Sequence, residues 1–167
     1  FTIGTGATSA SIGTDTYSGI EHIVGDDGDD IFNAAHLDTG DNSYDGDGGT
    51  NTISYASDSN SLVVDLAADT AVDGGETDTI LNFQNITTGS GDDTITGDSG
   101  NNIIIAGTGD DTFFGSAGTD TLTGGADTTG DWVDYSNMAS SNAITFTIGT
   151  GATSASIGTD TYSGIEH

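Results

Sequence analysis

The sequence contains no lysine, arginine, cysteine or proline, and only 32% of its 167 residues are hydrophobic. Nucleic acids, anionic membrane surfaces and acidic polysaccharides are bound through Lys and Arg, so the missing cations exclude these partners. The missing cysteines exclude disulfides, thiolate zinc sites and thiol catalysis. No hydrophobic run approaches the roughly 20 residues that a membrane-spanning helix needs, and we therefore expect no membrane insertion.

The chain is rich instead in Asp and Gly. It has 24 Asp and 3 Glu, which give a formal net charge of −27, and it has 27 Gly. Low hydrophobicity with a large charge of one sign is typical of disordered chains. Because helices favour Glu whereas Asp favours turns and metal-binding loops, the excess of Asp indicates turns. We expect the chain to stay unfolded unless it takes up cations from its surroundings.

A long repeat joins the two ends of the sequence. Residues 1–22 read FTIGTGATSASIGTDTYSGIEH, and residues 146–167 read the same, at an offset of 145 residues. We interpret residues 1–145 as one unit of a tandem array and residues 146–167 as the start of the next identical unit. Both ends fall inside a motif, so we expect the sequence to be a piece of a longer chain.

A nine-residue repeat lies within this unit. Each copy has Gly at the fourth position, Asp or Asn at the sixth and an apolar residue at the eighth. Residues 88–123 hold four copies without a gap, TGSGDDTIT, GDSGNNIII, AGTGDDTFF and GSAGTDTLT. The repeat blocks span residues 25–54 and 88–134, and we interpret residues 1–24, 53–87 and 132–145 as longer solenoid cassettes.

The two halves of a nonamer predict different structures. Gly and Asp in the first six positions favour a tight turn, since Gly adopts a positive φ without steric cost. The polar–apolar–polar ending is a minimal strand that buries its eighth residue. Two turns and two strands make a coil of eighteen residues, and stacked coils make a parallel solenoid. The sequence therefore predicts an all-β fold.

Stacking the coils aligns the sixth-position residues along the edges of the solenoid. Carboxylates that lie so close together cannot all stay ionised without a cation between them. Hard oxygens in flexible turns suit Ca²⁺, whereas Mg²⁺ prefers a strict octahedron and Zn²⁺ prefers His or Cys. The sixth-position residues are Asp30, Asn42, Asn51, Asp93, Asn102, Asp111, Asp120 and Asp131.

The nonamers resemble the GGxGxDxUx repeats of repeats-in-toxin (RTX) proteins, and the cassettes are similar to those of giant bacterial RTX adhesins. The resemblance implies a right-handed parallel β-roll or β-solenoid in which sixth-position Asp side chains and turn carbonyls hold several Ca²⁺ ions. It assigns ligation to Asp30, Asp93, Asp111 and Asp120, and to Asp131 after an insertion. The three Asn residues offer neutral oxygens, so we expect weaker sites there. Counting loops predicts roughly seven to ten ions per chain.

Further candidate ligands come from decayed nonamers and from neighbouring turn positions. Asp78 and Asp15 hold equivalent places, each at the sixth position of a decayed nonamer. The turns add other carboxylates that could complete a site with an Asn or with a neighbouring turn. These are Asp27, Asp29, Asp41, Asp47, Asp92 and Asp110.

The function we expect is structural and not enzymatic. The sequence has no HExxH or GxSxG motif and no cation to stabilise an oxyanion. We interpret it as a calcium-dependent segment of a secreted surface adhesin, extracellular filament or surface-layer protein. The resemblance implies type I secretion and a role in cell adhesion or a biofilm matrix. Neighbouring identical repeats and cell-surface or matrix components are the expected partners. The alternatives are a carbohydrate-binding or accessory module of a secreted RTX enzyme and an ice-binding solenoid.

Overall fold

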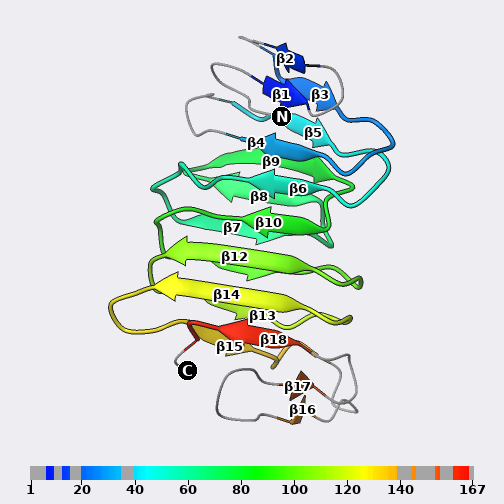
Figure 1. Cartoon of the computed structure of the whole chain (residues 1–167). Helices are drawn as coiled ribbons and strands as arrows, with labels where there is room; N and C mark the ends of the chain where they lie inside the picture. Colours follow the sequence, from blue (N-terminus) through cyan, green and yellow to red (C-terminus); the bar gives the residue numbers. More distant parts are fainter. Residues whose placement is uncertain are drawn as a thin grey trace.

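The computed structural model describes residues 7–9, 13–15, 20–34, 40–138, 144–145, 153–154 and 160–165. These residues form strands and turns, and no helix occurs among them, which confirms the expected all-β class. It follows that the described part of the chain has no helix long and apolar enough to cross a membrane. The strands stack one above another between the two ends of the molecule (Figure 1).

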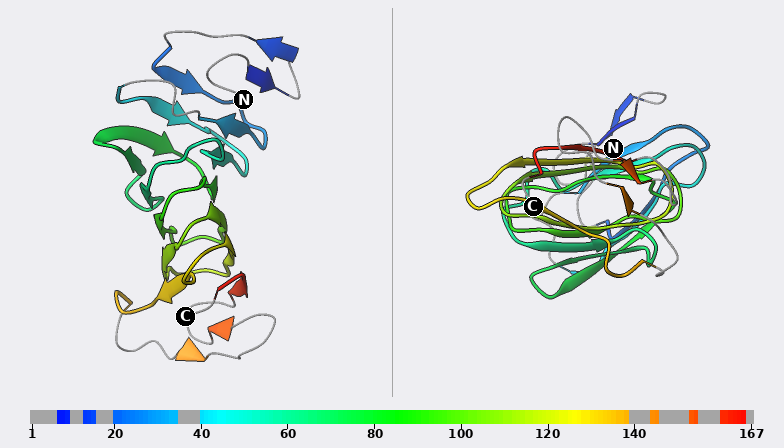
Figure 2. Two further views of the ribbon diagram at one scale, coloured as in Figure 1. Left: turned by 90° about the vertical axis from the view of Figure 1, so that its left-hand side faces the viewer. Right: turned by 90° about the horizontal axis from the view of Figure 1, so that it is seen from below.

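Two sheets face each other around a narrow interior (Figure 2). The six-stranded sheet has the order β18–β14–β12–β10–β6–β4 and the eight-stranded sheet has the order β15–β13–β11–β7–β8–β9–β5–β3. Strands of the six-stranded sheet are β4 (Ile31–Asn33), β6 (Thr52–Ser54), β10 (Asn85–Thr87), β12 (Ile103–Thr108), β14 (Thr121–Ala126) and β18 (Thr161–Ser163). Strands of the eight-stranded sheet are β3 (His22–Val24), β5 (Ser43–Asp45), β7 (Leu62–Asp65), β8 (Thr70–Asp73), β9 (Glu76–Leu81), β11 (Thr94–Thr96), β13 (Thr112–Phe114) and β15 (Trp132–Asp134). Two small antiparallel pairs join β1 (Ala7–Ser9) to β2 (Gly13–Asp15) and β16 (Ile144–Thr145) to β17 (Thr153–Ser154).

Successive nonamers supply strands to the two sheets in turn. β11 and β13 belong to the eight-stranded sheet, and β12 and β14 belong to the six-stranded sheet. Within each sheet these strands pair in parallel, with Ile95 opposite Phe113 and Ile104 opposite Leu122. Both offsets are 18 residues, so the coil predicted from two nonamers is present over residues 88–123.

Part of the cassette at residues 53–87 departs from the parallel pattern. β7, β8 and β9 form an antiparallel meander, in which β7 pairs in parallel with β11 and β9 pairs in parallel with β5. The physical reason lies in two tight reversals, where φ is positive at Asp69 (58°), Gly74 (56°) and Gly75 (108°). The eight-stranded sheet is therefore mixed rather than uniformly parallel.

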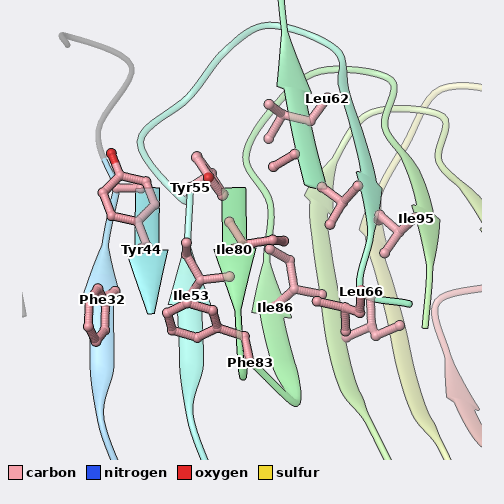
Figure 3. Packing of buried hydrophobic residues seen from close by; sticks show 14 of the residues in the cluster. Phe32, Tyr44, Ile53, Tyr55, Leu62, Leu66, Ile80, Phe83, Ile86 and Ile95 are labelled. Carbon is pink, nitrogen blue, oxygen red and sulfur yellow. The ribbon is translucent and has the colours of Figure 1, made fainter. Parts of the chain in front are cut away.

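The core is a ladder of eighth-position side chains. In the six-stranded sheet Phe32, Ile53, Ile86, Ile104 and Leu122 stack in register, and all are buried. Tyr44, Ile80, Ile95 and Phe113 are the buried counterparts in the eight-stranded sheet. Aromatic rings concentrate at the β4 end of this core, where Phe32 packs edge-on against Phe83 with centroids 5.0 Å apart (Figure 3). The turns that join the strands place the polar residues at the edges of this ladder.

Candidate metal centre

Residues at the sixth position of a coil turn, or at its equivalent, form two columns along the edges of the sheets. We define the mixed column as the residues that precede strands of the six-stranded sheet. We define the acidic column as the sixth-position residues of intact or decayed nonamers on the eight-stranded sheet. The mixed column contains Asp30, Asn51, Gln84, Asn102, Asp120 and Asp160. The acidic column contains Asn42, Asp78, Asp93, Asp111 and Asp131.

Side chains of both columns bind the backbone of the preceding coil. The N–H of Asp93 donates to Oδ1 of Asp111 at 2.8 Å, and the N–H of Asp111 donates to Oδ1 of Asp131 at 2.8 Å. In the mixed column the N–H of Asn102 donates to Oδ1 of Asp120 at 3.0 Å, and that of Asp30 donates to Oδ1 of Asn51 at 2.9 Å. One oxygen of each of these side chains therefore ties adjacent coils together.

Fifth-position side chains make the opposite connection, to the backbone of the following coil. Asp92 accepts the N–H of Asp110 at 3.0 Å, and Asp29 accepts the N–H of Thr50 at 2.7 Å. Asp41 accepts the N–H of Thr77 at 2.8 Å. The structure thus places these candidate ligands on an outer ladder of hydrogen bonds, at exposed or half-buried positions.

Asp110 shows what this outer ladder does to a carboxylate. The hydroxyl and the N–H of Thr129 and the N–H of Thr128 all donate to it. The hydrogen bond from the Thr129 hydroxyl, followed by the backbone bonds, holds the pKa of Asp110 well below its usual range. Its charge is therefore stabilised by the protein itself.

Three other predicted ligands lie apart from the columns. Asp47 adopts a positive φ of 56°, and its N–H donates to Asp45 at 2.9 Å, so it serves a tight turn. Asp27 lies exposed in the bend before β4. Asp15 belongs to β2, and its side chain lies outside the described part of the structure.

The acidic column contains the most deeply buried carboxylates. Asp93 and Asp111 expose 1% and 0% of their surface. Oδ2 of each is buried and has no hydrogen-bond partner among the described residues. Burial raises the pKa of both groups, and that of Asp111 rises to about 6, with the neighbouring charges of Asp93 and Asp131 adding to the effect of burial. A buried carboxylate that lacks a partner is costly unless it is protonated or meets a cation.

Asp58 is a member of this site that the nonamer pattern did not identify. It is 2% exposed, its Oδ1 accepts the N–H of Asn60 at 2.9 Å, and its negative charge contributes to the raised pKa of Asp93. Its backbone carbonyl accepts the N–H of Ser90, in the turn that leads to Asp93, at 3.0 Å. The only local signal is the Asp58-Ser-Asn60 turn, because this residue lies in a cassette outside the nonamer register.

In the mixed column, the side-chain amide nitrogens have hydrogen-bond partners within the protein. Nδ2 of Asn51 donates to the carbonyls of Gly48 and Asn82 at 2.9 and 3.0 Å. Nδ2 of Asn102 donates to the carbonyl of Gln84 at 2.8 Å. Gln84 and Asp160, which also belong to this column, were not among the predicted residues, although Asp160 is the repeat copy of Asp15.

Hydroxyl groups cover the second oxygen of three other column carboxylates. Ser116 donates to Oδ2 of Asp120 at 2.9 Å, and Tyr55 donates to Oδ2 of Asp78 at 2.9 Å. Tyr135 and Tyr162 both donate to Oδ2 of Asp160, at 2.7 and 3.2 Å. Burial raises the pKa of Asp78, Asp120 and Asp160.

The donor set of the acidic column fits a hard cation. Among the described residues, no three His, Cys, Asp or Glu side chains converge on one point, so backbone carbonyls would have to complete a site with one or two of the column carboxylates. This mixture matches the preference of Ca²⁺ for six to eight oxygen ligands in irregular geometry. One backbone carbonyl does lie near a column carboxylate, since a Cβ at Gly124 would overlap both Oδ2 of Asp131 and the carbonyl oxygen of Gly164.

Comparison with known protein families places this geometry in context. Residues 85–113 and 96–128 match the RTX calcium-binding nonapeptide repeat, with four copies in all. No curated protein matches the chain. The matched segment contains Asp93 and Asp111, whose Oδ2 atoms are buried and have no hydrogen-bond partner within the described structure. Residues 85–128 therefore carry copies of the RTX calcium-binding nonapeptide repeat.

Proposed function

We propose that this chain is a structural segment of a secreted bacterial surface adhesin, extracellular filament or surface-layer protein, and that it folds when it binds Ca²⁺ outside the cell. The observation that carries the proposal is the pair of buried, unsatisfied oxygens of Asp93 and Asp111 in a chain without Lys or Arg. A cation from the medium is the partner that these groups lack.

Calcium binding and folding are coupled in this proposal. The column carboxylates come together only when coils stack, so the unfolded chain has no preformed site. An ion that binds only the folded state contributes its binding free energy to folding. A cytosol poor in free Ca²⁺ leaves the chain an extended polyanion, and millimolar Ca²⁺ outside the cell folds it.

The architecture supports a role in extension. Alternation between the sheets and the 18-residue parallel offsets support a parallel β-roll, with the antiparallel meander as a local insertion. A right-handed coil is the expected hand for parallel crossovers of this kind. The identical segments 1–22 and 146–167 support tandem units of residues 1–145, which lengthen a rod as copies are added. Mechanical extension and multivalent display gain from identical copies in series.

Circular dichroism of the purified chain tests the coupling. We expect a disordered spectrum in calcium-free buffer, a β spectrum at millimolar Ca²⁺, and reversal by excess EGTA. Magnesium at the same concentration is the control, and we expect it to fold the chain poorly because it gives up its waters reluctantly. A β spectrum that persists in the chelator contradicts the proposed function.

A further inference from the structure

We propose that the ions bind along one edge of the molecule only. In this arrangement Ca²⁺ occupies the acidic column from Asp93 to Asp131, beside Asp58. The amide run, which we define as Asn51, Gln84 and Asn102 of the mixed column, takes no ion. The inference rests on the proposed calcium-dependent folding and specifies which residues carry it.

The amide run is closed by its own hydrogen bonds. The carbonyl oxygen of each amide has a backbone donor: Asp30 N–H for Asn51 (2.9 Å), Asn51 N–H for Gln84 (2.7 Å) and Asp98 N–H for Asn102 (3.0 Å). Each amide nitrogen donates to a backbone carbonyl, at distances from 2.8 to 3.3 Å. Three consecutive members of the column therefore need no external partner.

The same hydrogen bonds remove the other ligands that a calcium site would use. The carbonyls of Gly48, Asn82 and Gln84 already accept amide N–H groups. An ion at this edge would have to displace those donors, and the three amide side chains would offer it only neutral oxygens. The carboxylate beside them, Asp98, already accepts a hydrogen bond from Nδ2 of Asn102 at 3.0 Å. Ca²⁺ affinity falls as the number of charged ligands falls, so this exchange is unfavourable.

The hydrogen bonding of the acidic column differs from that of the amide run. Asp93, Asp111 and Asp131 follow one another on successive coils, each with Oδ1 bound to a backbone N–H. The second oxygens of Asp93 and Asp111 are buried and lack a donor within the described chain. No amide interrupts these three carboxylates, whereas the amide run on the other edge contains no carboxylate.

Tyr55 distinguishes Asp78 from the later carboxylates of the acidic column. Tyr55 donates its hydroxyl to Oδ2 of Asp78 at 2.9 Å, so this carboxylate of the acidic column already has a protein partner. The next buried carboxylates towards β15 are Asp58, in the segment between β6 and β7, and Asp93, which precedes β11. With one ion between neighbouring coils from this level to Asp131, we expect about two or three Ca²⁺ at this edge rather than one for every loop.

The number of bound ions in matched variants tests the inference. We would measure Ca²⁺ bound per chain at saturation, by equilibrium dialysis, for the wild type, Asp111→Asn and Asn102→Ser. Asp111→Asn removes a charged ligand from the acidic column, and we expect it to lose at least one ion. Asn102→Ser changes the amide run nine residues earlier, and we expect it to keep the wild-type number. Asn51→Ser provides the same control if Asn102→Ser fails to give the wild-type circular dichroism spectrum.

Trp132 provides a second, local readout. It is the only tryptophan, and it directly follows Asp131 of the acidic column. Tb³⁺ bound beside Asp131 is close enough to be sensitised by this indole. We expect Asp111→Asn to lose most of the Tb³⁺ luminescence and Asn102→Ser to retain it.

The outcomes separate this inference from the function on which it rests. If the wild type binds no Ca²⁺ and does not fold with it, the proposed function fails. If the wild type binds and folds, but Asn102→Ser loses as many ions as Asp111→Asn, only the one-edge arrangement is wrong. Retention of all ions by Asp111→Asn, or one ion for every loop in the wild type, also overturns it.

Discussion

Asp92 and Asp93 are adjacent in the chain and carry the same side chain, yet their surroundings differ. Asp92 is exposed and accepts a backbone N–H from the following coil, whereas Asp93 is buried and accepts one from β7. Asp110 and Asp111 repeat the difference, with a lowered pKa for the first and a raised pKa for the second. Position within the turn, rather than residue type, decides which carboxylate needs a cation.

The raised pKa of Asp111 predicts how pH affects the calcium-free chain. Its pKa is about 6 in the folded state against an ordinary value of 3.8, so the folded chain binds this proton more tightly than the unfolded chain. The resulting stability is complete below pH 3.8 and is lost as the pH rises through about 6. We expect calcium-free protein to gain β structure between pH 7 and pH 4, measured by circular dichroism.

Asp111→Asn is the control for this pH effect. The variant lacks the titrating group, so its calcium-free β content should vary less steeply between pH 4 and pH 6. A calcium-free fold that becomes more stable as the pH rises through this range would show that the buried carboxylates do not govern it.

At the scale of the elements, coil stacking depends on glycines that touch the coil below. Gly109 has a φ of 138°, and a Cβ there would overlap the carbonyl oxygen of Gly91 on the adjacent coil. Gly40 has a similar φ of 125°, but a Cβ there would meet no atom of the described chain within 4 Å. Comparing the two positions therefore separates the cost of a strained φ from the cost of a steric clash between coils.

Alanine substitution of these two glycines tests the stacking requirement. Gly40→Ala should cost only the strain of an unfavourable φ, about 1–2 kcal/mol. Gly109→Ala adds a clash with backbone that cannot move aside, and we expect a larger loss of unfolding free energy, measured by urea denaturation at saturating Ca²⁺. Equal losses for the two variants would mean that close contact between coils does not limit the fold.

The meander of β7, β8 and β9 shows how far the elements could be predicted. The apolar alternation of Leu62 and Val64 predicts a strand in either direction, because period two is the same for parallel and antiparallel pairing. Pairing direction depends on the reversals near Asp69 and Gly75, which bring β8 between its neighbours. The local pattern is therefore compatible with either pairing, and the turn geometry decided how these strands pair.

At the scale of the whole molecule, the net charge of −27 sets the balance between extended and folded states. At 1 M ionic strength the Debye length is about 3 Å, so salt screens the repulsion between exposed carboxylates. It supplies no ligand to buried oxygens. We expect small-angle scattering to give a radius of gyration near 40 Å for the calcium-free chain, the value of an unfolded chain of this length. Molar NaCl should reduce this radius only slightly, whereas millimolar Ca²⁺ should collapse it. Collapse in NaCl alone would argue that general repulsion, and not the acidic column, keeps the chain open.

The sequence by itself determined the nonamer register, and with it the 18-residue coil, the buried eighth position and the alignment of sixth-position residues. These follow from a short period that fixes turn and strand locally. It could not place Asp58 or Gln84, since neither belongs to an intact nonamer, and it could not separate fifth-position from sixth-position carboxylates. It also could not distinguish Asp15 from Asp160, which lie in identical segments.

Only the tertiary structure decided these points, because each depends on which coil lies alongside. Asp160 is buried and accepts the N–H of Asp120 because β18 pairs with β14, whereas the strand that contains Asp15 pairs with β1. Asp93 lacks a partner for Oδ2 within the described chain, while Asp78 has Tyr55. A hydrogen bond between coils joins residues 18 to 40 positions apart, and no local pattern of nine residues specifies that neighbour.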